Sequence, residues 1–298
     1  MTTTINSELI EIVSVGNTLG EGVLWDPLGQ RAWWTDIQER RLFRYDPRSR
    51  ELESFDLPER LCSFGFIEGS DKIVAAFESG FARYHPESAR LQWLSRPRHE
   101  ASNVRFNDGR IDRQGRFWAG SMVEGKGEPK GKLYCLGPNG VKVCLTGISI
   151  SNSICFSPDG KHLYFADSPQ RTILRFDIDP ASGTIGNRQI FAKTPKEAFP
   201  DGANVDDEGC LWSAHWGAGR VVRYAPDGSI DAVVEVPTTQ VSCVAFGGAA
   251  LDLLFVTSAR EGMSAAILHE QPHAGDVFVY KVNVKGLPDL RFAMEPVA

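Results

Sequence analysis

The sequence repeats one pattern six times, and this repeat limits the possible folds more than any other feature. Each copy has an apolar segment, a turn rich in Gly and Asp, and a second segment rich in aromatic and β-branched residues. The copies occupy residues 22–36, 64–78, 108–122, 153–167, 202–216 and 243–257. The second segments are anchored at Trp34, Val74, Trp118, Tyr164, Trp212 and Phe255, with intervals of 40, 44, 46, 48 and 43 residues. Such regular spacing indicates a chain built from repeated structural units.

Each copy is followed by further short strand patterns, such as RRLFRYD and then ELESFDL after the first copy. A repeat therefore supplies about four strands in roughly 45 residues, the size of a propeller blade. We predict an all-β fold, a six-bladed β-propeller with four-stranded antiparallel blades around a central channel, as a single domain over residues 1–298. The sixth repeat lacks an outer strand. We expect ELIEIVSV near the N-terminus, or alternatively the final LPDLRFAME, to complete that blade and close the ring.

Charge and cysteine usage exclude several classes of partner. The chain has 32 Lys+Arg against 38 Asp+Glu, a net charge of −6, and no basic run. Nucleic acids and anionic membrane surfaces need a concentrated basic region, so we expect neither partner. The N-terminal MTTTINSELIEIVSV lacks the pattern of a secretory signal, which predicts a cytoplasmic protein. The six cysteines form no C-x-x-C pair, which favours reduced, buried thiols over disulfides or a zinc site.

The repeat also predicts where polar residues meet. The innermost strands of a propeller all start at the same end of the channel. Counting back 11 to 13 residues from each anchor gives six polar residues, Glu21, Ser63, Asn107, Asn152, Asp201 and Ser242. Carboxylate and amide oxygens suit a divalent cation, with Ca²⁺ the first choice and Mg²⁺, Mn²⁺, Fe²⁺ or Zn²⁺ as alternatives. The cation would also relieve repulsion between Glu21 and Asp201. The alternative interpretation is a polar, water-filled channel.

Asp201 belongs to the tripeptide Pro-Asp-Gly, which occurs three times in the chain. Pro-Asp-Gly is a common turn sequence, and the copies at 158–160 and 226–228 lie where turns are expected. The copy at 200–202 instead precedes an innermost strand, and its blade has a separate turn at DDEG. Asp201 is therefore free for another role.

Several motifs together resemble the senescence marker protein/gluconolactonase family, which includes regucalcin and bacterial sugar-acid lactonases. They are LGEGVLW (19–25), RFNDGRID (105–112), WAGSM (118–122), ISNSICFSPDGKHLYFAD (150–167), FPDGANVDDEGCLW (199–212) and VTSAREGMS (256–264). The resemblance covers about residues 13 to 281 in the same order. It implies a six-bladed propeller with a divalent metal in the channel.

The resemblance also implies roles for particular residues. The metal ligands of the family fall on Glu21, Asn152 and Asp201, and its substrate-binding residues fall on Arg105 and Asn107. Glu124, shortly after the GSM motif, is a looser match to a further pocket residue. The implied activity is hydrolysis of an aldonolactone, such as a glucono-, xylono-, galactono- or arabinono-lactone, to its aldonic acid. The metal polarises the lactone carbonyl, and Asp201 acts as general base. The expected partner is a small sugar lactone, and the chain is expected to be a monomer or a weak homo-oligomer.

Other residues and functions stay open at this point. The second strand of each blade returns to the same rim, which makes Asp36, Glu78, Asp167, His215 and Arg260 possible pocket residues. A serine hydrolase is disfavoured because no G-x-S-x-G elbow occurs. Alternative functions are a calcium-binding propeller, an esterase or organophosphate hydrolase of related type, and a non-catalytic propeller scaffold. The scaffold predicts small or apolar residues at the rim, unlike Glu21 and Asp201.

Overall fold

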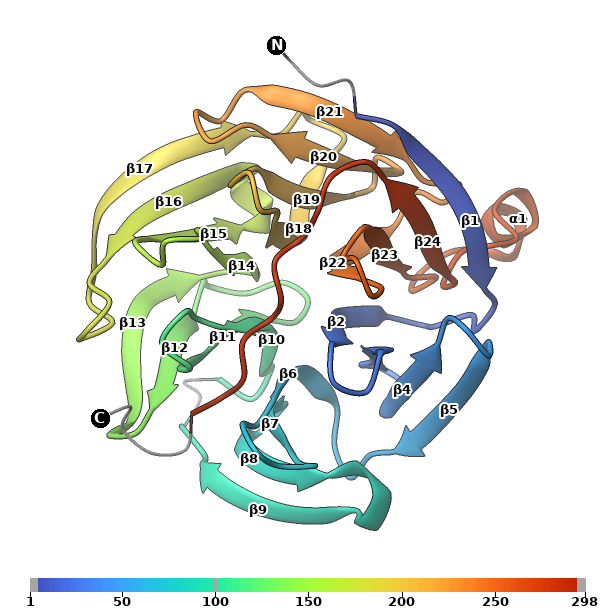
Figure 1. Cartoon of the computed structure of the whole chain (residues 1–298). Helices are drawn as coiled ribbons and strands as arrows, with labels where there is room; N and C mark the ends of the chain where they lie inside the picture. The colour runs from blue at the N-terminus through green and yellow to red at the C-terminus, as the bar shows by residue number, and fades with distance from the viewer. Residues whose placement is uncertain (1–4, 99–100, 294–298) are drawn as a thin grey trace.

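The computed structural model describes residues 5–98 and 101–293, and it places six four-stranded antiparallel sheets in a ring (Figure 1). Blade 1 contains β2 (Gly20–Asp26), β3 (Arg31–Asp36), β4 (Arg41–Asp46) and β5 (Glu51–Asp56). Blade 2 contains β6 (Leu61–Phe66), β7 (Ile73–Phe77), β8 (Gly80–His85) and β9 (Arg90–Ser95). Blade 3 contains β10 (Val104–Ile111), β11 (Phe117–Val123), β12 (Gly131–Gly137) and β13 (Gly140–Ile148). The predicted repeats thus correspond to blades.

The other three blades continue the ring. Blade 4 contains β14 (Ser151–Phe156), β15 (His162–Asp167), β16 (Thr172–Ile178) and β17 (Ile185–Lys193). Blade 5 contains β18 (Phe199–Val205), β19 (Leu211–Trp216), β20 (Arg220–Tyr224) and β21 (Ile230–Glu235). Blade 6 combines β22 (Val241–Gly247), β23 (Leu253–Ser258) and β24 (Val277–Val282) with β1 (Ser7–Val13). The predicted six-bladed β-propeller is confirmed.

The N-terminal segment closes the ring. β1 pairs antiparallel with β24, from Ser7 opposite Val282 to Val13 opposite Val277. This pairing confirms the prediction that ELIEIVSV supplies the missing outer strand. The alternative, that LPDLRFAME does so, is wrong for the residues the structure describes. This pairing places the N-terminal strand in the same sheet as β22, β23 and β24, so backbone hydrogen bonds between sequence-distant strands hold the ring closed.

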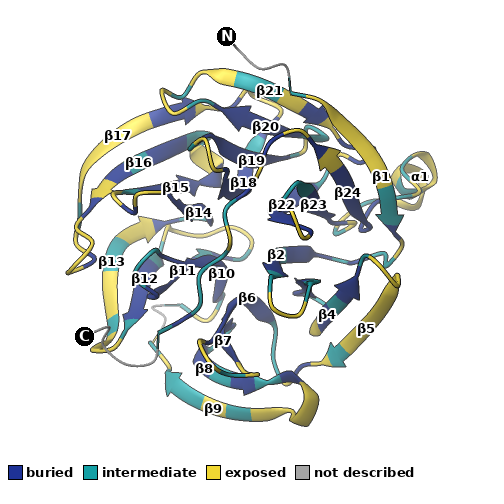
Figure 2. Cartoon of the chain, viewed as in Figure 1, coloured by how far each residue is buried: buried dark blue, intermediate teal, exposed yellow. Residues whose placement is uncertain are grey.

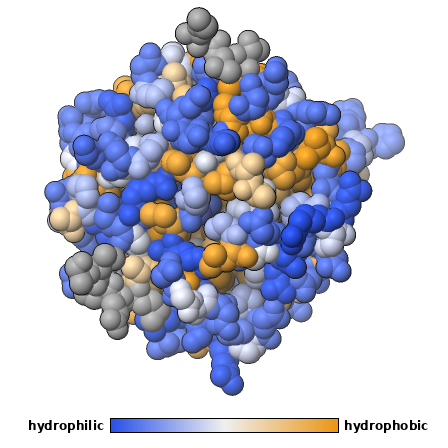
Figure 3. Space-filling view, viewed as in Figure 1, coloured by the Kyte–Doolittle hydropathy of each residue, from blue (hydrophilic) through white to orange (hydrophobic). Residues whose placement is uncertain are grey.

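The C-terminal residues 285–293, here called the strap, cross the channel at the end where the innermost strands finish (Figure 1). The strap makes backbone bridges from Gly286 to Asp206 of blade 5 and from Phe292 to Ile67 of blade 2. Inside the channel, Arg110 donates to Asp289 of the strap at 2.5 Å. The face crossed by the strap is mostly hydrophilic, with apolar residues toward its middle (Figure 3). The opposite end of the channel, where the innermost strands begin, holds the residues of the predicted site.

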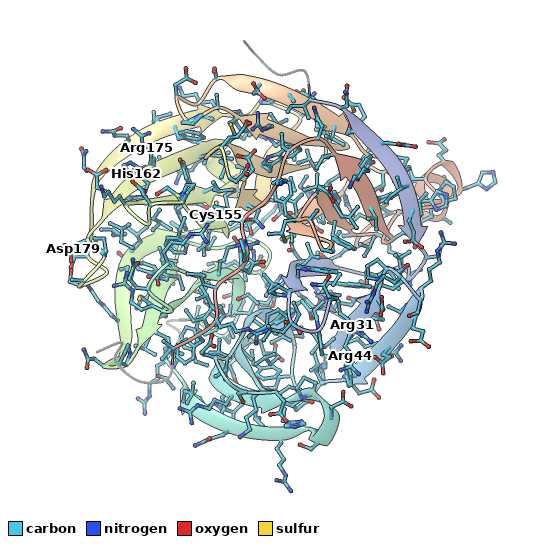
Figure 4. All side chains as sticks on the ribbon, in the orientation of Figure 1. Arg31, Arg44, Cys155, His162, Arg175 and Asp179 are labelled. Atoms are coloured by element: carbon cyan, nitrogen blue, oxygen red, sulfur yellow. The ribbon has the colours of Figure 1, made fainter. Side chains whose placement is uncertain are left out.

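Burial follows strand position within each blade. β6 and β22 are buried along their whole length because neighbouring blades cover both faces, whereas β5 is mostly exposed (Figure 2). Figure 4 shows the same gradient, with Cys155 near the channel and Arg175 and Asp179 toward the outside. Apolar side chains packed between blades hold the ring together, since burial of apolar surface is the main stabilising term.

The same set of hydrogen bonds stabilises the turn between the first two strands in blades 3 and 5. In blade 3, Asp112 accepts hydrogen bonds from the backbone N–H groups of Gln114 and Arg116 and from Trp118 Nε1. In blade 5, Asp206 does the same for Glu208, Cys210 and Trp212 Nε1. The aspartate satisfies turn donors and an indole N–H that would otherwise be buried without partners.

Helical structure among the described residues is short. It comprises two 3₁₀ turns, η1 (Pro86–Ser88) and η2 (Ser168–Gln170), and one helix, α1 (Ala265–Glu270), which Ser264 caps by accepting from the backbone of Ile267. No helix in residues 5–98 and 101–293 has the length and apolar character that a membrane crossing requires. All six cysteines are free, five of them buried, as the spacing of the thiols predicts.

Candidate metal centre and active site

The polar residues of the channel lie at a distortion that every innermost strand shares. Register shifts occur between Glu21 and Leu24, Leu61 and Ser63, Phe106 and Gly109, Asn152 and Cys155, Pro200 and Ala203, and Val241 and Cys243. A β-bulge bends its strand and changes the direction of the side chains beside it. The bulge therefore helps to turn the polar residue of this position toward the channel in blades 1, 3, 4 and 5.

The residues that follow the predicted ligands have unusual backbone conformations. Gly22, after Glu21, has φ +60°, and Ser153, after Asn152, has φ +57°. A non-glycine residue with positive φ costs free energy, so the surrounding structure must hold Ser153 in this conformation. The Ser153 hydroxyl donates to the carbonyl oxygen of Asp201 at 2.6 Å, which ties the Asn152 and Asp201 strands together. Gly202, after Asp201, packs so tightly that an added Cβ would lie 2.5 Å from Cys243 Sγ.

These strands enclose a cavity of about 300 Å³ at the end where the innermost strands begin. Glu21, Asn107, Asn152 and Asp201 all line it, which brings the three predicted metal ligands together. Arg105, Ser168 and Glu261 line it as well, together with the apolar side chains of Leu19, Met122, Ile150, Phe199 and Trp216. The two serines of the predicted rim lie outside its lining. Ser63 and Ser242 are buried, and Ser242 Oγ donates to the carbonyl of Gly20.

The carboxyl groups of Glu21, Asp201 and the neighbouring Asp108 are buried and interact with one another. Burial raises the pKa of Glu21 to about 8, and the negative charge of Asp108 adds to the shift. Burial and the charge of Glu21 also hold the pKa of Asp201 well above its ordinary value. Burial raises the pKa of Asp108 to about 6, although the Ile154 N–H and Arg110 oppose the shift. Within the described chain, no Lys, Arg or His forms an ion pair with Glu21 or Asp201.

The donor set fits a divalent cation. Asn152 Nδ2 donates to Ser168 Oγ at 2.8 Å, and Asn152 Oδ1 accepts from Asn107 Nδ2 at 2.9 Å. These two bonds fix the orientation of the amide and leave its oxygen a second lone pair. Two carboxylates and one amide oxygen are hard donors of the kind that Ca²⁺ and Mg²⁺ prefer. A cation would also neutralise charges whose burial is otherwise unfavourable.

A second acidic cluster, at the opposite end of β18, does not fit a metal. Asp206, Glu208 and Cys210 have potential ligand atoms within 4.8 Å of one another. Arg223 already occupies this cluster, because its guanidinium donates to Asp206 at 2.8 Å and to Glu208 and Asp231 at 2.5 Å. Burial also raises the pKa of the Cys210 thiol to about 12, which opposes formation of the thiolate that binds metals. The chain supplies the cation for this cluster itself.

A hydrogen-bonded chain of side chains surrounds one side of the cavity. Arg60 donates to both oxygens of Glu124, at 2.7 and 3.0 Å, and Arg105 Nε donates to Glu124 Oε1 at 2.9 Å. Burial opposes ionisation of Glu124, but the hydrogen bonds from Arg60 and the charge of Arg105 lower its pKa overall. Arg105 Nη1 also donates to Asn107 Oδ1 at 2.8 Å. Glu124 thus holds Arg105 in place rather than lining the cavity itself.

Other predicted pocket residues have structural contacts. His215 is buried on β19, where its Nε2 lies 3.1 Å from the Tyr224 hydroxyl, and burial lowers its pKa to about 4. Arg260 is exposed beside Gly16. Asp36 and Asp167 accept hydrogen bonds from the backbone just before β2 and β14, and Glu78 pairs with Arg60. All five lie outside the lining of the cavity.

Sequence reasoning missed Arg60, Asp108 and Glu261. Arg60 lies just before β6, so the same counting that found Ser63 could have pointed to it. Asp108 directly follows Asn107, where the β-bulge turns it inward, and only knowledge of the bulge could have signalled this. Glu261 comes from the loop after β23, one residue beyond Arg260, to which the return of the second strand to the rim had pointed.

The fold and the site define this chain as a six-bladed propeller with an acidic oxygen-donor site at one mouth of its channel. It belongs to the SMP-30/gluconolactonase/LRE-like family, whose family model matches residues 19–260. It is 36% identical over 292 residues to the 6-deoxy-6-sulfogluconolactonase of Pseudomonas putida, covering 97% of this chain and 100% of that protein. It is 38% identical over 285 residues to the L-arabinolactonase of Azospirillum brasilense, covering 94% of each.

A solved structure supports the same assignment. The calcium-binding protein regucalcin of Agrobacterium tumefaciens superposes with a TM-score of 0.91 at 32% identity, covering 95% of this chain and 97% of that one. The resemblance inferred from the motifs is therefore confirmed.

Proposed function

We propose that this chain hydrolyses an aldonolactone to its aldonic acid, with a divalent metal held by Glu21, Asn152 and Asp201. It is an enzyme of the sugar-lactonase class, a hydrolase of cyclic carboxylic esters, as are the relatives that share almost its whole length. The main evidence for a metal is the buried pair of carboxylates, Glu21 and Asp201. No basic side chain among the described residues forms an ion pair with either of them.

The proposed reaction adds water to the lactone carbonyl and breaks the ring C–O bond. When bound, the metal polarises the carbonyl and stabilises negative charge on its oxygen. Asp201 accepts a proton from the attacking water, and its position in the cavity beside Glu21 and Asn152 suits this role. The ring oxygen leaves as a hydroxyl after it takes up the proton that Asp201 accepted from the water, which returns Asp201 to its ionised form. Glu21 and Asn152 serve as ligands and hold no proton that the reaction needs.

Arg105 and Asn107 position the substrate in this proposal. Both line the cavity, and hydrogen bonds to Glu124 and Asn107 orient the guanidinium of Arg105. Asn107 Nδ2 donates to the carbonyl of Ser151 and to Asn152 Oδ1, so its amide mainly orients Asn152. Asn107 Oδ1 keeps one lone pair for a sugar hydroxyl. Glu124 acts as the positioning residue for Arg105.

Ca²⁺ is the proposed metal, because a calcium-binding regucalcin shares this fold at 32% identity. Zn²⁺, Mn²⁺, Mg²⁺ and Fe²⁺ remain alternatives that the same oxygen donors can accept. The cytoplasmic location stays a prediction, supported by six free thiols. The monomeric or weakly oligomeric state also stays a prediction.

The test is metal reconstitution of lactone hydrolysis. The chain is stripped with a chelator, checked for retained β-structure by circular dichroism, and assayed on glucono-, galactono-, xylono- and arabinono-1,4-lactones with single divalent ions added back. We expect ring opening only with metal, and a rise in thermal stability that follows the metal concentration, as binding to the folded state requires. Folded protein that opens none of these lactones with any ion contradicts the proposal.

A further inference from the structure

The cavity has two layers, which follow from the alternation of side chains along a strand. Residues two apart share a face, and the earlier one lies nearer the mouth because the innermost strands begin there. The layer farther from the mouth is polar and contains Glu21, Asn152 and Asp201. Nearer the mouth, two residues earlier in the sequence, are Leu19 and Ile150, which directly precede β2 and β14, and Phe199 at the start of β18, and all six residues line the cavity. The part of a substrate that extends away from the metal therefore meets a largely apolar wall.

Glu261 interrupts this apolar wall. It lies in the loop that follows β23, lines the cavity, and accepts a hydrogen bond from Gln38 Nε2 on its Oε1 at 2.5 Å. Its backbone carbonyl accepts from Gln240 Nε2 at 3.1 Å, which anchors the loop. The Gln38 amide in turn accepts from Arg60 Nη1 at 3.4 Å. Contacts from three blades thus hold a carboxylate at the mouth of the cavity.

No described cation neutralises Glu261. Arg60 is paired with Glu78 and Glu124, and Arg105 is paired with Glu124. Arg171 stacks over the Phe199 ring at 4.3 Å, and the exposed Arg260 lies beside Gly16. Neither Arg171 nor Arg260 lines the cavity. The Glu261 carboxylate therefore presents unpaired negative charge and a free acceptor oxygen to whatever fills the upper layer.

We propose that Glu261 is a specificity-determining residue that selects lactones with a neutral, hydroxyl-bearing tail and disfavours lactones with an anionic tail. This inference rests on the proposed lactonase function. A tail hydroxyl donates to the free oxygen of Glu261 while the C–H groups of the chain pack on Phe199 and Trp216. A carboxylate, sulfonate or phosphate at the same place meets a like charge and has no donor to bind it.

The test compares two lactones that differ only at carbon 6, D-glucono-1,4-lactone with a hydroxymethyl end and D-glucaro-1,4-lactone with a carboxylate end. The metal-loaded wild type is expected to show at least about tenfold higher kcat/KM for the neutral lactone. This ratio corresponds to the repulsion between two like charges in contact near a protein surface. Glu261→Gln keeps an amide oxygen for Gln38 but removes the charge. It is expected to reduce this preference about fivefold to tenfold, through KM rather than kcat.

Two further variants complete the design. Glu261→Lys is expected to reverse the preference and favour the glucarolactone. Glu270→Gln, on the exposed helix α1 outside the cavity lining, removes the same charge from the same loop region and is expected to leave the preference unchanged. Thermal unfolding of each variant identifies any loss of folding.

The outcomes separate this inference from the proposed function. If the wild type opens the neutral lactone but Glu261→Gln changes both lactones equally, Glu261 has only a structural role and the inference is wrong. A wild type that prefers the glucarolactone overturns it as well. If the folded, metal-loaded protein opens no lactone, the proposed function itself fails.

Discussion

Two acidic clusters lie at opposite ends of one strand. Asp201 is near the start of β18 and belongs to the channel cluster with Glu21 and Asp108. Asp206 directly follows the end of β18 and belongs to the turn cluster with Glu208 and Asp231. Both aspartates are buried. The clusters differ in their ion pairs, because Arg223 pairs with all three carboxylates of the turn cluster, whereas no described Lys, Arg or His forms an ion pair with Glu21 or Asp201.

The comparison distinguishes a stabilising cluster from a functional one. A buried carboxylate that accepts bonds from backbone, Trp212 and Arg223 is held in one structure by its partners. A buried carboxylate whose main neighbours are other carboxylates is unfavourable until something binds. Acidic residues close together are therefore a poor guide to a metal centre unless the nearby cations are examined too.

The largest expected effect is on activity at the channel cluster. Asp201→Asn removes the proposed base and weakens a ligand, so kcat/KM for the preferred lactone should fall by about 10²–10⁴-fold or more. The stability of the metal-free protein should stay equal or rise, because one of the repelling carboxylates is gone. Steady-state kinetics and thermal unfolding measure the two effects. Retained turnover would remove Asp201 from its proposed role.

The turn cluster should respond in the opposite way. Arg223→Met keeps much of the apolar stem but leaves Asp206 buried without its cation, which should cost about 3–5 kcal/mol of unfolding free energy. Under conditions where the variant is folded, its kcat/KM should match the wild type. Chemical denaturation and the lactone assay provide the comparison with Asp201→Asn. A stable Arg223→Met with lost activity would show that the two clusters are coupled.

The sequence predicted the ring and the position of the candidate site because both follow from the repeat. Every blade places the same strand position at the same mouth, so the spacing grouped six residues, and the three that the family resemblance implies as metal ligands, Glu21, Asn152 and Asp201, line one cavity. The spacing could not show which of the six rim residues line the cavity, because the shape of the cavity depends on the bulges and on the loops between strands. Thus Ser63 and Ser242 share the register but are buried outside the cavity lining, and Glu261 enters the lining from the long loop between β23 and β24.

The pH dependence of stability should differ with and without metal. The pKa of Glu21 is raised from about 4.5 when unfolded to about 8 in the folded protein. The folded metal-free state therefore binds more protons, and its stability should decrease as the pH rises between these values, by at most about 1.4 kcal/mol per pH unit. Bound metal should remove this decrease because it favours the charged carboxylate.

Thermal unfolding of the metal-free protein between pH 5 and 8 measures this effect, with Glu21→Gln as the matched variant that cannot titrate at that position. An equal decline in Glu21→Gln and wild type would assign the dependence to other groups.

The smallest effect is expected at the exposed edge of the turn cluster. The Glu208 side chain is 56% exposed, so its ion pair with Arg223 is well solvated although the guanidinium itself is buried. Glu208→Gln leaves Arg223 bonded to Asp206 and Asp231 and should cost less than about 1 kcal/mol, with no change in lactone hydrolysis. Chemical denaturation of Glu208→Gln and Arg223→Met in parallel measures the loss of unfolding free energy in each variant. A cost equal to that of Arg223→Met would mean that the cluster needs all of its acids, whereas a small cost confirms that the buried Asp206–Arg223 contact carries its stability.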